Sequence, residues 1–503
     1  MLYVKLILKH KVEVIFLSVI IISYFVLRLP NLTLQPIFAD EAIYIRWAQV
    51  MRSEPTLRFL PQTDGKTPLF MWIMIPFFKF FHDPLFAGRF LSVLSGFFTL
   101  LGVFFLAKKV FNQRVALWAA FIYVITPYTV FFDRMALVDS MLSAFTIWII
   151  YFAIWLAESV RLDIAMFLGY LLGGAILTKT PATINFLLVP LSILNFKIDK
   201  TKKNYFLRLF VLWLVAIGIG FLMYNILRLG PQFQLLSSRN QDYVFSPVEL
   251  ISRPLDPFIP HMKDMIDWFP KLFTPFTLIA VAIGIFFVIK SLNKRALTVL
   301  FWALLPMLFY MAFLKTFTAR YLLTSIAPLL IFGGYGVQTI SNVRFRISNK
   351  ILSIIIFILI MVPSVYFDYQ LLIIPPPNSL PKEERIGYFE DWTAGYGFSQ
   401  IADILKEERK KGKVVVGTEG FFGTLPDGLY IYLDKADVSI IGSSATISAQ
   451  LRDSAKNYPT YFVGNKKSIE NSLKNVQLIK EYPKAKPADS NNIDATVLLK
   501  ILP

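Results

Sequence analysis

Two adjacent carboxylates, Asp40 and Glu41, follow an almost wholly apolar run, Val12 to Leu29, in the stretch PIFADEAIYIRWAQVM. Ionisable groups near membrane depth are costly, so a carboxylate pair in this position indicates a functional site. A carboxylate there can act as a general base that takes a proton from an attacking hydroxyl group. Asp40 also has a structural alternative, because an aspartate N-cap would satisfy the open amides of the following helix. Capping and catalysis are compatible, so both interpretations stay open.

Cationic side chains stand in three further polar segments at the edges of apolar runs. Lys66 lies in DGKTPLFMW, Lys179 in LTKTPA, and the pair Arg320 and Tyr321 in TARYLLTSIAPLL. An arginine next to a tyrosine fits a phosphate clamp with a hydroxyl donor. Snorkelling at a helix end is the structural alternative for Lys66. For Arg320 the alternative is a membrane-boundary anchor.

Two more polar segments hold candidate residues. Asp139 is the second aspartate of FFDRMALVDSMLSAF and precedes an apolar run. It is a candidate site residue, and the structural alternative is a helix N-cap. Arg239 and Asp242 lie in SSRNQDYVFS, within a long segment that could fold over a site as a lid. An ordinary loop salt bridge explains Arg239 equally well.

The composition places these residues in a membrane protein. The chain has 503 residues, of which 56% are hydrophobic, more than a soluble core of this size needs. Its apolar runs of about twenty residues, separated by Lys and Arg clusters, are typical of a polytopic membrane protein. The net charge of +18 therefore indicates basic cytoplasmic loops and not a nucleic-acid partner. The absence of cysteine excludes disulfides, thiol catalysis and cysteine-ligated metals.

Six basic connections predict the topology: KLILKHK, KKVFNQR, ESVRLD, KIDKTKKNYFLR, KSLNKR and SNVRFRISNK. Placing all six inside gives eleven transmembrane helices, with the N-terminus inside and the C-terminus outside. The segment TPLFMWIMIPFFKFF is short for a span and is predicted to be an interfacial helix, which leaves Leu85–Ala107 as the second span. The outer loops, chiefly residues 30–84 and 228–271, then carry nearly all the candidate residues.

The character of the sequence changes near residue 375. Residues 1–374 are predicted to form the transmembrane domain, and residues 375–503 a soluble α/β domain on the outer face. PPPNSLPKEER is predicted to be a linker, and GFSQIADILKEERKKG a helix that stops at glycine. KVVVGTEG, ADVSIIG, PTYFVGN and ATVLLKIL have the pattern of short strands. GTEGFFG lacks the lysine and spacing of a phosphate-binding loop, which favours a plain turn.

The ordered set of motifs, over roughly residues 10–370, resembles the protein O-mannosyltransferase and lipid A aminoarabinose transferase families. These are glycosyltransferases of the GT-C fold. The resemblance implies a polytopic α-helical GT-C domain that transfers a sugar from a polyprenyl-phosphate donor to a hydroxyl acceptor at the outer face of the cytoplasmic membrane. The partners would be the lipid-linked sugar, membrane lipid and an acceptor that is a protein, a glycolipid or a polysaccharide. The identity of the sugar stays open.

The resemblance also implies roles for individual residues. Asp40 matches the catalytic base of these families, and Glu41 would orient the loop or assist the acceptor. Asp139 would orient Lys66 or the sugar. A phosphate leaving group needs cations because charge develops on its oxygens. The predicted donor-phosphate ligands are Lys66, Arg320, Tyr321, Arg239 and Lys179.

One departure from the families concerns a metal. In the aminoarabinose branch an acidic residue before the lysine assists metal binding, but Gly65 occupies that position here. Of the three histidines, His261 lies in the long outer loop 228–271, and a lone histidine is usually structural. We therefore predict no cofactor; a divalent metal is not indicated.

Three other functions compete with glycosyl transfer. A transporter or flippase of lipid-linked sugars would place its polar groups near the bilayer midplane, whereas this chain concentrates them in loops on one face. A membrane-anchored scaffold would need neither eleven spans nor the charged constellation. An oligosaccharide:protein transferase would carry a Trp-Trp-Asp signature, but EDWTAGYG has Asp391 before a single Trp392.

Overall fold

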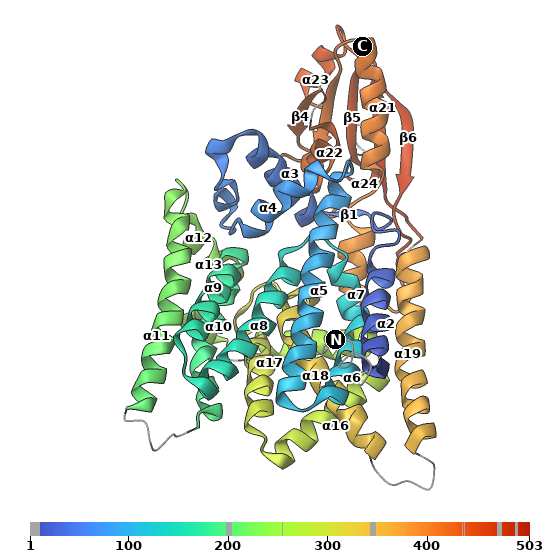
Figure 1. Ribbon diagram of the computed structural model, residues 1–503. Coiled ribbons are helices and arrows are strands. Elements are labelled where there is room, and N and C mark those ends of the chain that lie inside the picture. The colour runs from blue at the N-terminus through green and yellow to red at the C-terminus, as the bar shows by residue number, and fades with distance from the viewer. Residues whose placement is uncertain are drawn as a thin grey trace.

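The computed structural model consists of a helical bundle and a C-terminal α/β part that covers one end of the bundle (Figure 1). It describes residues 11–197, 204–253, 255–342, 349–434, 436, 438–469, 475–487 and 491–503. The predicted fold class, a helical membrane protein with a C-terminal α/β domain, is confirmed. Three of the six basic connections, at residues 5–11, 197–208 and 341–350, lie wholly or partly outside the described residues. We call the end of the bundle beneath the C-terminal part the covered end.

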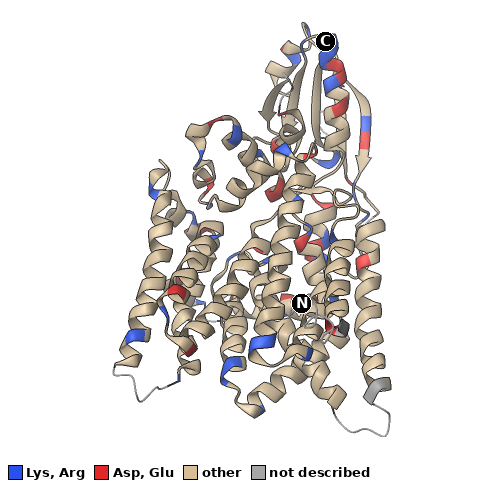
Figure 2. Cartoon of the chain, in the orientation of Figure 1, with Lys and Arg blue, Asp and Glu red and all other residues tan. Residues whose placement is uncertain are grey.

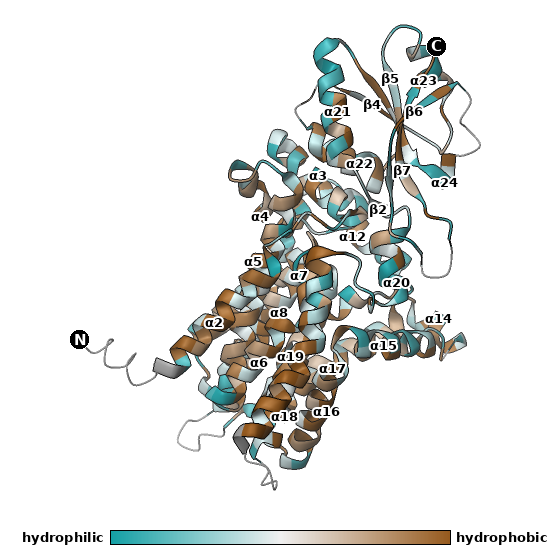
Figure 3. Cartoon of the chain, turned by 90° about the vertical axis from the view of Figure 1, so that its right-hand side faces the viewer, coloured by the Kyte–Doolittle hydropathy of each residue, from teal (hydrophilic) through white to brown (hydrophobic). Residues whose placement is uncertain are grey.

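The bundle is built from apolar helices, much of whose length is brown in the hydropathy colouring of Figure 3. Within the described residues, six helices are long and apolar enough to cross a membrane, or up to eight if each bent pair is one span. The predicted count of eleven crossings is not confirmed and stays a prediction. The predicted second span lies within α5. The helices are α2 (Lys11–Arg28), α5 (Pro84–Val110), α6 (Gln113–Ile125), α7 (Pro127–Asp133), α8 (Val138–Ser159), α9 (Leu162–Thr178), α10 (Thr183–Leu188), α11 (Tyr205–Tyr224), α16 (Pro275–Ser291), α17 (Lys294–Phe313), α18 (Leu323–Asn342) and α19 (Asn349–Ile373).

The segment between the first two long helices folds at the covered end (Figure 1). The run predicted to be an interfacial helix forms two short helical pieces, which join without a gap at Ile75. The elements here are α3 (Ala39–Ser53), η1 (Pro55–Leu57), η2 (Leu60–Asp64), α4 (Leu69–Met74) and η3 (Ile75–Lys79).

The long segment before α16 forms η6 (Asn225–Leu229), α12 (Leu235–Ser238), α13 (Asn240–Tyr243), α14 (Pro247–Ser252) and α15 (Phe258–Leu272). Helix α15 runs across the bundle axis (Figure 3) and bends by 112° into α16. Its exposed apolar side chains, Ile259, Met262 and Ile266, are spaced three and four residues apart and share one face. Such a face is typical of a helix that lies in the membrane interface.

The C-terminal part contains a five-stranded sheet of order β4-β3-β5-β7-β6. Strand β3 is parallel to β4 and β5, and β7 is antiparallel to β5 and β6. The helix and the four strands predicted from sequence are all present. The first three residues of GTEGFFG end strand β3, and the rest form the bend that follows it, in which Gly420 and Gly423 have positive φ. The elements are α20 (Lys382–Arg385), η8 (Ile386–Glu390), β2 (Ala394–Gly395), α21 (Phe398–Lys411), β3 (Val415–Glu419), α22 (Thr424–Leu433), β4 (Ser439–Ser443), α23 (Ala449–Ser454), β5 (Thr460–Asn465), α24 (Lys466–Ile469), β6 (Val476–Pro483) and β7 (Ala495–Ile501).

A small sheet joins the C-terminal part to the start of α3. Strand β1 (Ile37–Phe38) pairs antiparallel with β2. The Ala39 backbone N–H donates to the carbonyl oxygen of Thr393 at 3.1 Å. The residues directly before Asp40 are therefore held by the C-terminal part.

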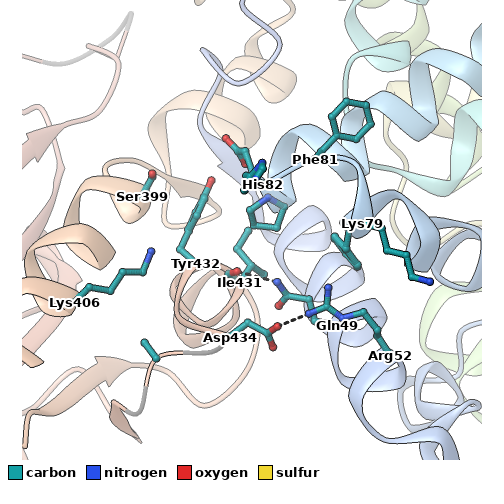
Figure 4. Close-up of a pocket in the computed structure, with 14 residues that line it drawn as sticks. Gln49, Arg52, Lys79, Phe81, His82, Ser399, Lys406, Ile431, Tyr432 and Asp434 are labelled. Carbon is teal, nitrogen blue, oxygen red and sulfur yellow. Dashed lines mark hydrogen bonds and ion pairs between the residues drawn. The ribbon is translucent and has the colours of Figure 1, made fainter. Parts of the chain in front are cut away.

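Side chains further along α3 extend this junction. Asp434 forms ion pairs with Arg46 at 2.9 Å and with Arg52 at 2.8 Å. The Gln49 side-chain amide donates to the Ile431 carbonyl oxygen at 2.8 Å, close to the Arg52 ion pair (Figure 4). Charged residues are numerous at this junction and in the C-terminal part, whereas the bundle helices carry few (Figure 2).

Candidate active site

A cavity of about 290 Å³ lies at the covered end of the bundle, among α3, the loop before α4, the start of α8, the end of α9 and η7 (Ala319–Leu322). It brings together residues as far apart in the sequence as Asp40 and Tyr321. Of the eight predicted site residues, six line this cavity: Asp40, Lys66, Asp139, Lys179, Arg320 and Tyr321. Glu41 and Arg239 do not.

Asp40 lies between two cations. Its Oδ2 is 2.7 Å from the Arg320 guanidinium, and its Oδ1 is 3.5 Å from the Lys66 ammonium. Burial alone would raise the pKa of Asp40, but the charges of Arg320 and Lys66 bring it below its ordinary value. The N-cap of α3 is Phe38 and not Asp40, so the capping alternative for Asp40 is wrong. Asp40 is thus an ionised carboxylate that faces the cavity.

Lys66 is surrounded by acceptors and aromatic rings. Its ammonium lies 3.3 Å from the Asp64 carboxylate, 5.2 Å from the centre of the Tyr44 ring and 6.0 Å from that of Trp47. Burial would lower the pKa of Lys66, but the oxygens of Tyr44, Asp40 and Asp64 raise it above its ordinary value. Lys66 therefore stays protonated and can bind an anion. Asp64 was not among the site residues predicted from sequence.

Asp139 pairs with Lys179 and not with Lys66. The Asp139 carboxylate accepts from the Lys179 ammonium at 2.7 Å, which corrects the predicted orientation of Lys66 by Asp139. The N-cap of α8 is Leu137, so Asp139 is not a cap either. The Lys179 ammonium also lies 4.0 Å from the centre of the Tyr321 ring. Lys179, Asp139 and Tyr321 thus form a second polar wall of the cavity.

Arg239 lies outside the cavity lining and is half exposed. Its guanidinium pairs with Asp64 at 2.5 Å and with Asp242 at 2.8 Å. It packs over Gly65, where a Cβ atom would come within 2.5 Å of the Arg239 Cβ, and Gly65 has a φ of +65°. Glycine at position 65 is therefore required by the turn and by this contact. The loop salt bridge, left open in the sequence analysis, describes Arg239 better than a phosphate ligand does.

The loop that carries Arg239 still covers part of the cavity. Asn240, Tyr243 and Val244 line it. Two backbone hydrogen bonds of 2.8 Å fix this loop to the segment after α17: Phe245 N–H to Phe313 O, and Lys315 N–H to Tyr243 O.

Glu41 is fully buried, and its contacts hold together the segments around Asp40. Its carboxylate pairs with Arg89 at 2.7 and 2.8 Å and accepts the backbone N–H groups of Ala136 at 2.6 Å and Phe38 at 3.0 Å. These contacts favour the first of its two predicted roles, orienting the loop, over contact with an acceptor.

Replacing Glu41 with alanine is expected to destabilise the fold by about 3–5 kcal/mol, because Arg89 would remain buried without a counter-charge. Thermal unfolding in detergent measures the loss. As a control, Asp163→Ala removes one partner of the exposed pair Arg161–Asp163 and should leave the melting temperature unchanged. Equal melting temperatures for Glu41→Ala and the wild type would contradict the structural role.

Sequence reasoning missed two further groups around the site. Arg28 forms a buried ion pair with Asp133 at 3.0 Å, and Arg134 donates to the carbonyl oxygens of residues 28, 30 and 31. Glu384 of α20 accepts the backbone N–H of Ala319, next to Arg320, at 2.8 Å. No sequence signal distinguished Glu384, because KEER has the composition of a solvated linker.

No group of three His, Asp or Glu side chains that could hold a metal ion occurs among the described residues. The carboxylates of Asp40 and Asp64 are instead paired with cations. His261 is buried; its Nδ1–H donates to the Met311 carbonyl oxygen at 2.9 Å, and its ring stacks on Phe317.

Comparison with known proteins identifies the type of enzyme. Residues 65–227 match the family described as dolichyl-phosphate-mannose-protein mannosyltransferase. This range includes Lys66, Asp139 and Lys179. No curated protein matches the chain.

Solved structures share the fold over nearly the whole chain. ArnT from Cupriavidus metallidurans bound to undecaprenyl phosphate is 15% identical, with a TM-score of 0.57 over 97% of this chain and 98% of that chain. Its apo state has a TM-score of 0.55, with 97% of each chain covered and the same identity. The oligosaccharyltransferase AglB from Archaeoglobus fulgidus, in complex with an inhibitory peptide and a dolichol-phosphate, is 11% identical, with a TM-score of 0.52 over 91% of this chain and 70% of that chain.

The resemblance stated from sequence and the predicted enzyme class are both confirmed. The protein is a membrane glycosyltransferase with the GT-C fold; residues 65–227 are similar to the protein mannosyltransferase family, and the whole chain is similar in fold to ArnT.

Proposed function

We propose that this glycosyltransferase moves a sugar, with inversion, from a polyprenyl-phosphate donor to a hydroxyl acceptor at the outer face of the cytoplasmic membrane. The observation that carries the proposal is the position of Asp40, a carboxylate paired with Arg320 at 2.7 Å and near Lys66 at 3.5 Å inside the cavity. The solved ArnT bound to undecaprenyl phosphate and the AglB complex with a dolichol-phosphate support a donor of this class.

The cations of the cavity suit the donor phosphate. Lys66 and Arg320 would bind its oxygens, where negative charge develops as the bond to the sugar breaks. The Tyr321 hydroxyl and the Lys179 ammonium lie on the second polar wall and would contact the same phosphate or the sugar. Asp139 would hold Lys179 in place through the 2.7 Å hydrogen bond.

Asp40 would act as the general base. The acceptor hydroxyl oxygen attacks the anomeric carbon, the bond from that carbon to the phosphate oxygen breaks, and the hydroxyl proton passes to Asp40. The electron pair of the broken bond leaves with polyprenyl phosphate. The charges of Arg320 and Lys66 hold the pKa of Asp40 below its ordinary value. A bound phosphate would share those cations, which raises the pKa of Asp40 and makes it a stronger base at the moment it is needed.

The arrangement of the bundle supports the outer-face location. The basic residues Lys108, Lys109, Lys290, Lys294 and Arg295 stand at helix ends remote from the cavity. Positively charged loops are retained on the cytoplasmic side, which supports an outer location for the covered end. The apolar face of α15 would lie in the outer interface, at the depth where a lipid-linked sugar presents its head group.

Reconstitution tests the proposal. The purified protein would be supplied with a panel of polyprenyl-phosphate sugars and a membrane and cell-wall extract as acceptor. Release of polyprenyl phosphate together with capture of the sugar is the expected result, and the productive donor identifies the sugar. If lipid-linked sugar crosses the bilayer with no release of polyprenyl phosphate, the protein is a transporter and the proposal is wrong.

A further inference from the structure

The backbone next to Arg320 is held at both of its hydrogen-bonding groups. The N–H of Ala319 donates to the Glu384 carboxylate at 2.8 Å, and the Ala319 carbonyl oxygen accepts from the Tyr128 hydroxyl at 2.5 Å. Glu384 is 4% exposed and belongs to α20, outside the bundle helices. The segment that leads into the C-terminal part therefore reaches the backbone of the arginine that pairs with Asp40.

The same segment also contacts the other neighbours of Arg320. The Tyr388 ring lies 4.5 Å from the ring of Phe38, the N-cap of the helix that carries Asp40. The Arg320 guanidinium lies 5.3 Å from the centre of that Phe38 ring. Glu384 and Tyr388 thus contact residues that lie next to each partner of the Arg320–Asp40 ion pair, Ala319 and Phe38.

We propose that Glu384 is a positioning residue of the transfer reaction, which fixes the backbone at Arg320 and sets by its own charge how strongly Arg320 binds the donor phosphate. The reaction itself rests on the proposed function above. The part of the proposal that concerns phosphate binding by Arg320 requires only that an anionic lipid phosphate enters the cavity.

Glu384 changes charge in the neutral pH range. Burial raises the pKa of Glu384 to about 7, although the Ala319 N–H and the Arg320 charge oppose the rise and Glu383 adds to it. The hydroxyl groups of Tyr128 and Tyr388 also face it. The ionised form of Glu384 places a negative charge near Arg320. This charge offsets part of the positive charge of Arg320 and weakens its attraction for the phosphate. The neutral form keeps a carbonyl oxygen for the Ala319 N–H without that competition.

The test compares the wild type with Glu384→Gln, which keeps an acceptor oxygen but cannot ionise. We expect the ratio of the wild-type Kd for undecaprenyl phosphate to that of Glu384→Gln to rise from about one at pH 6 to roughly three at pH 8.5. The phosphate's own ionisation affects both proteins equally and cancels in this ratio. Glu384→Ala, which removes the acceptor, is expected to weaken binding at every pH.

Glu407→Gln is the control, because Glu407 is an exposed glutamate of α21 whose ion-pair partner is the exposed Lys410. Its Kd should follow that of the wild type over the whole range. A Kd ratio for Glu384→Gln that does not change with pH would overturn the charge role, and unchanged binding in Glu384→Ala would overturn the positioning role. Neither readout requires turnover. If the Kd ratio changes with pH as expected but the protein transfers no sugar in the reconstitution experiment, the proposed function is wrong. The role of Glu384 in phosphate binding would still hold.

Discussion

Replacing Asp40 with asparagine is expected to lower kcat about 1000-fold, the scale of losing a general base. Asparagine keeps the size of the side chain and can still accept from Arg320, but it cannot take up the acceptor proton. Donor binding should be retained or become tighter, because a negative charge 2.7 Å from the Arg320 guanidinium no longer competes with the phosphate. A loss confined to kcat therefore separates the base from the phosphate ligands.

Single-turnover release of polyprenyl phosphate measures this effect, with donor binding determined in parallel. Asp242→Asn is the matched control, since Asp242 lies in the loop over the cavity but pairs with Arg239 and does not line the site. It should transfer sugar at the wild-type rate. If Asp40→Asn retains more than a tenth of the activity, Asp40 only orders Arg320 and Lys66, and a different group is the base.

The sequence predicted which segments meet, because the topology follows from basic clusters and apolar lengths. Placing the basic connections on one side left the segments of Asp40, Lys66, Asp139, Lys179 and Arg320 together on the other, and all five line one cavity. The number of crossings is harder to predict, since α9 and the helical run Thr180–Asn195 are shorter than a full span and α15 bends sharply into α16. Length and composition alone do not decide how such pieces cross.

The pairing of individual side chains was not predictable, because it depends on angles between elements. Asp139 was expected near Lys66, but the end of α9 brings Lys179 within 2.7 Å of it. Glu41 and Asp40 are neighbours in the sequence, yet successive residues of a helix point in different directions, so one faces Arg89 and the other the cavity. Glu384 lay hidden in a charged linker, and only packing shows that it is buried.

Replacing Arg320 with glutamine is expected to lower kcat/KM about 100-fold, mainly through a higher donor KM, because a charge-assisted bond to the phosphate is lost. The pH profile should change as well. Asp40 is active when ionised, and Arg320 helps to hold its pKa below the ordinary value. Without Arg320 the pKa of Asp40 rises, so activity on the acid side is lost at a higher pH than in the wild type. The dependence of kcat/KM on pH between about 4 and 7 measures this shift.

Arg161→Gln is the control for this charge removal, because Arg161 is an exposed arginine that pairs with Asp163 and does not line the cavity. Its profile should overlay that of the wild type. A second comparison separates the two roles of Arg320: Lys66→Gln also removes a cation near Asp40, at the longer distance of 3.5 Å. Its acid limb should therefore move in the same direction but by less, because the interaction between charges weakens with distance. An acid limb that stays in place in both variants would mean that Asp40 does not titrate in the rate-determining step, and the phosphate clamp alone would account for the loss.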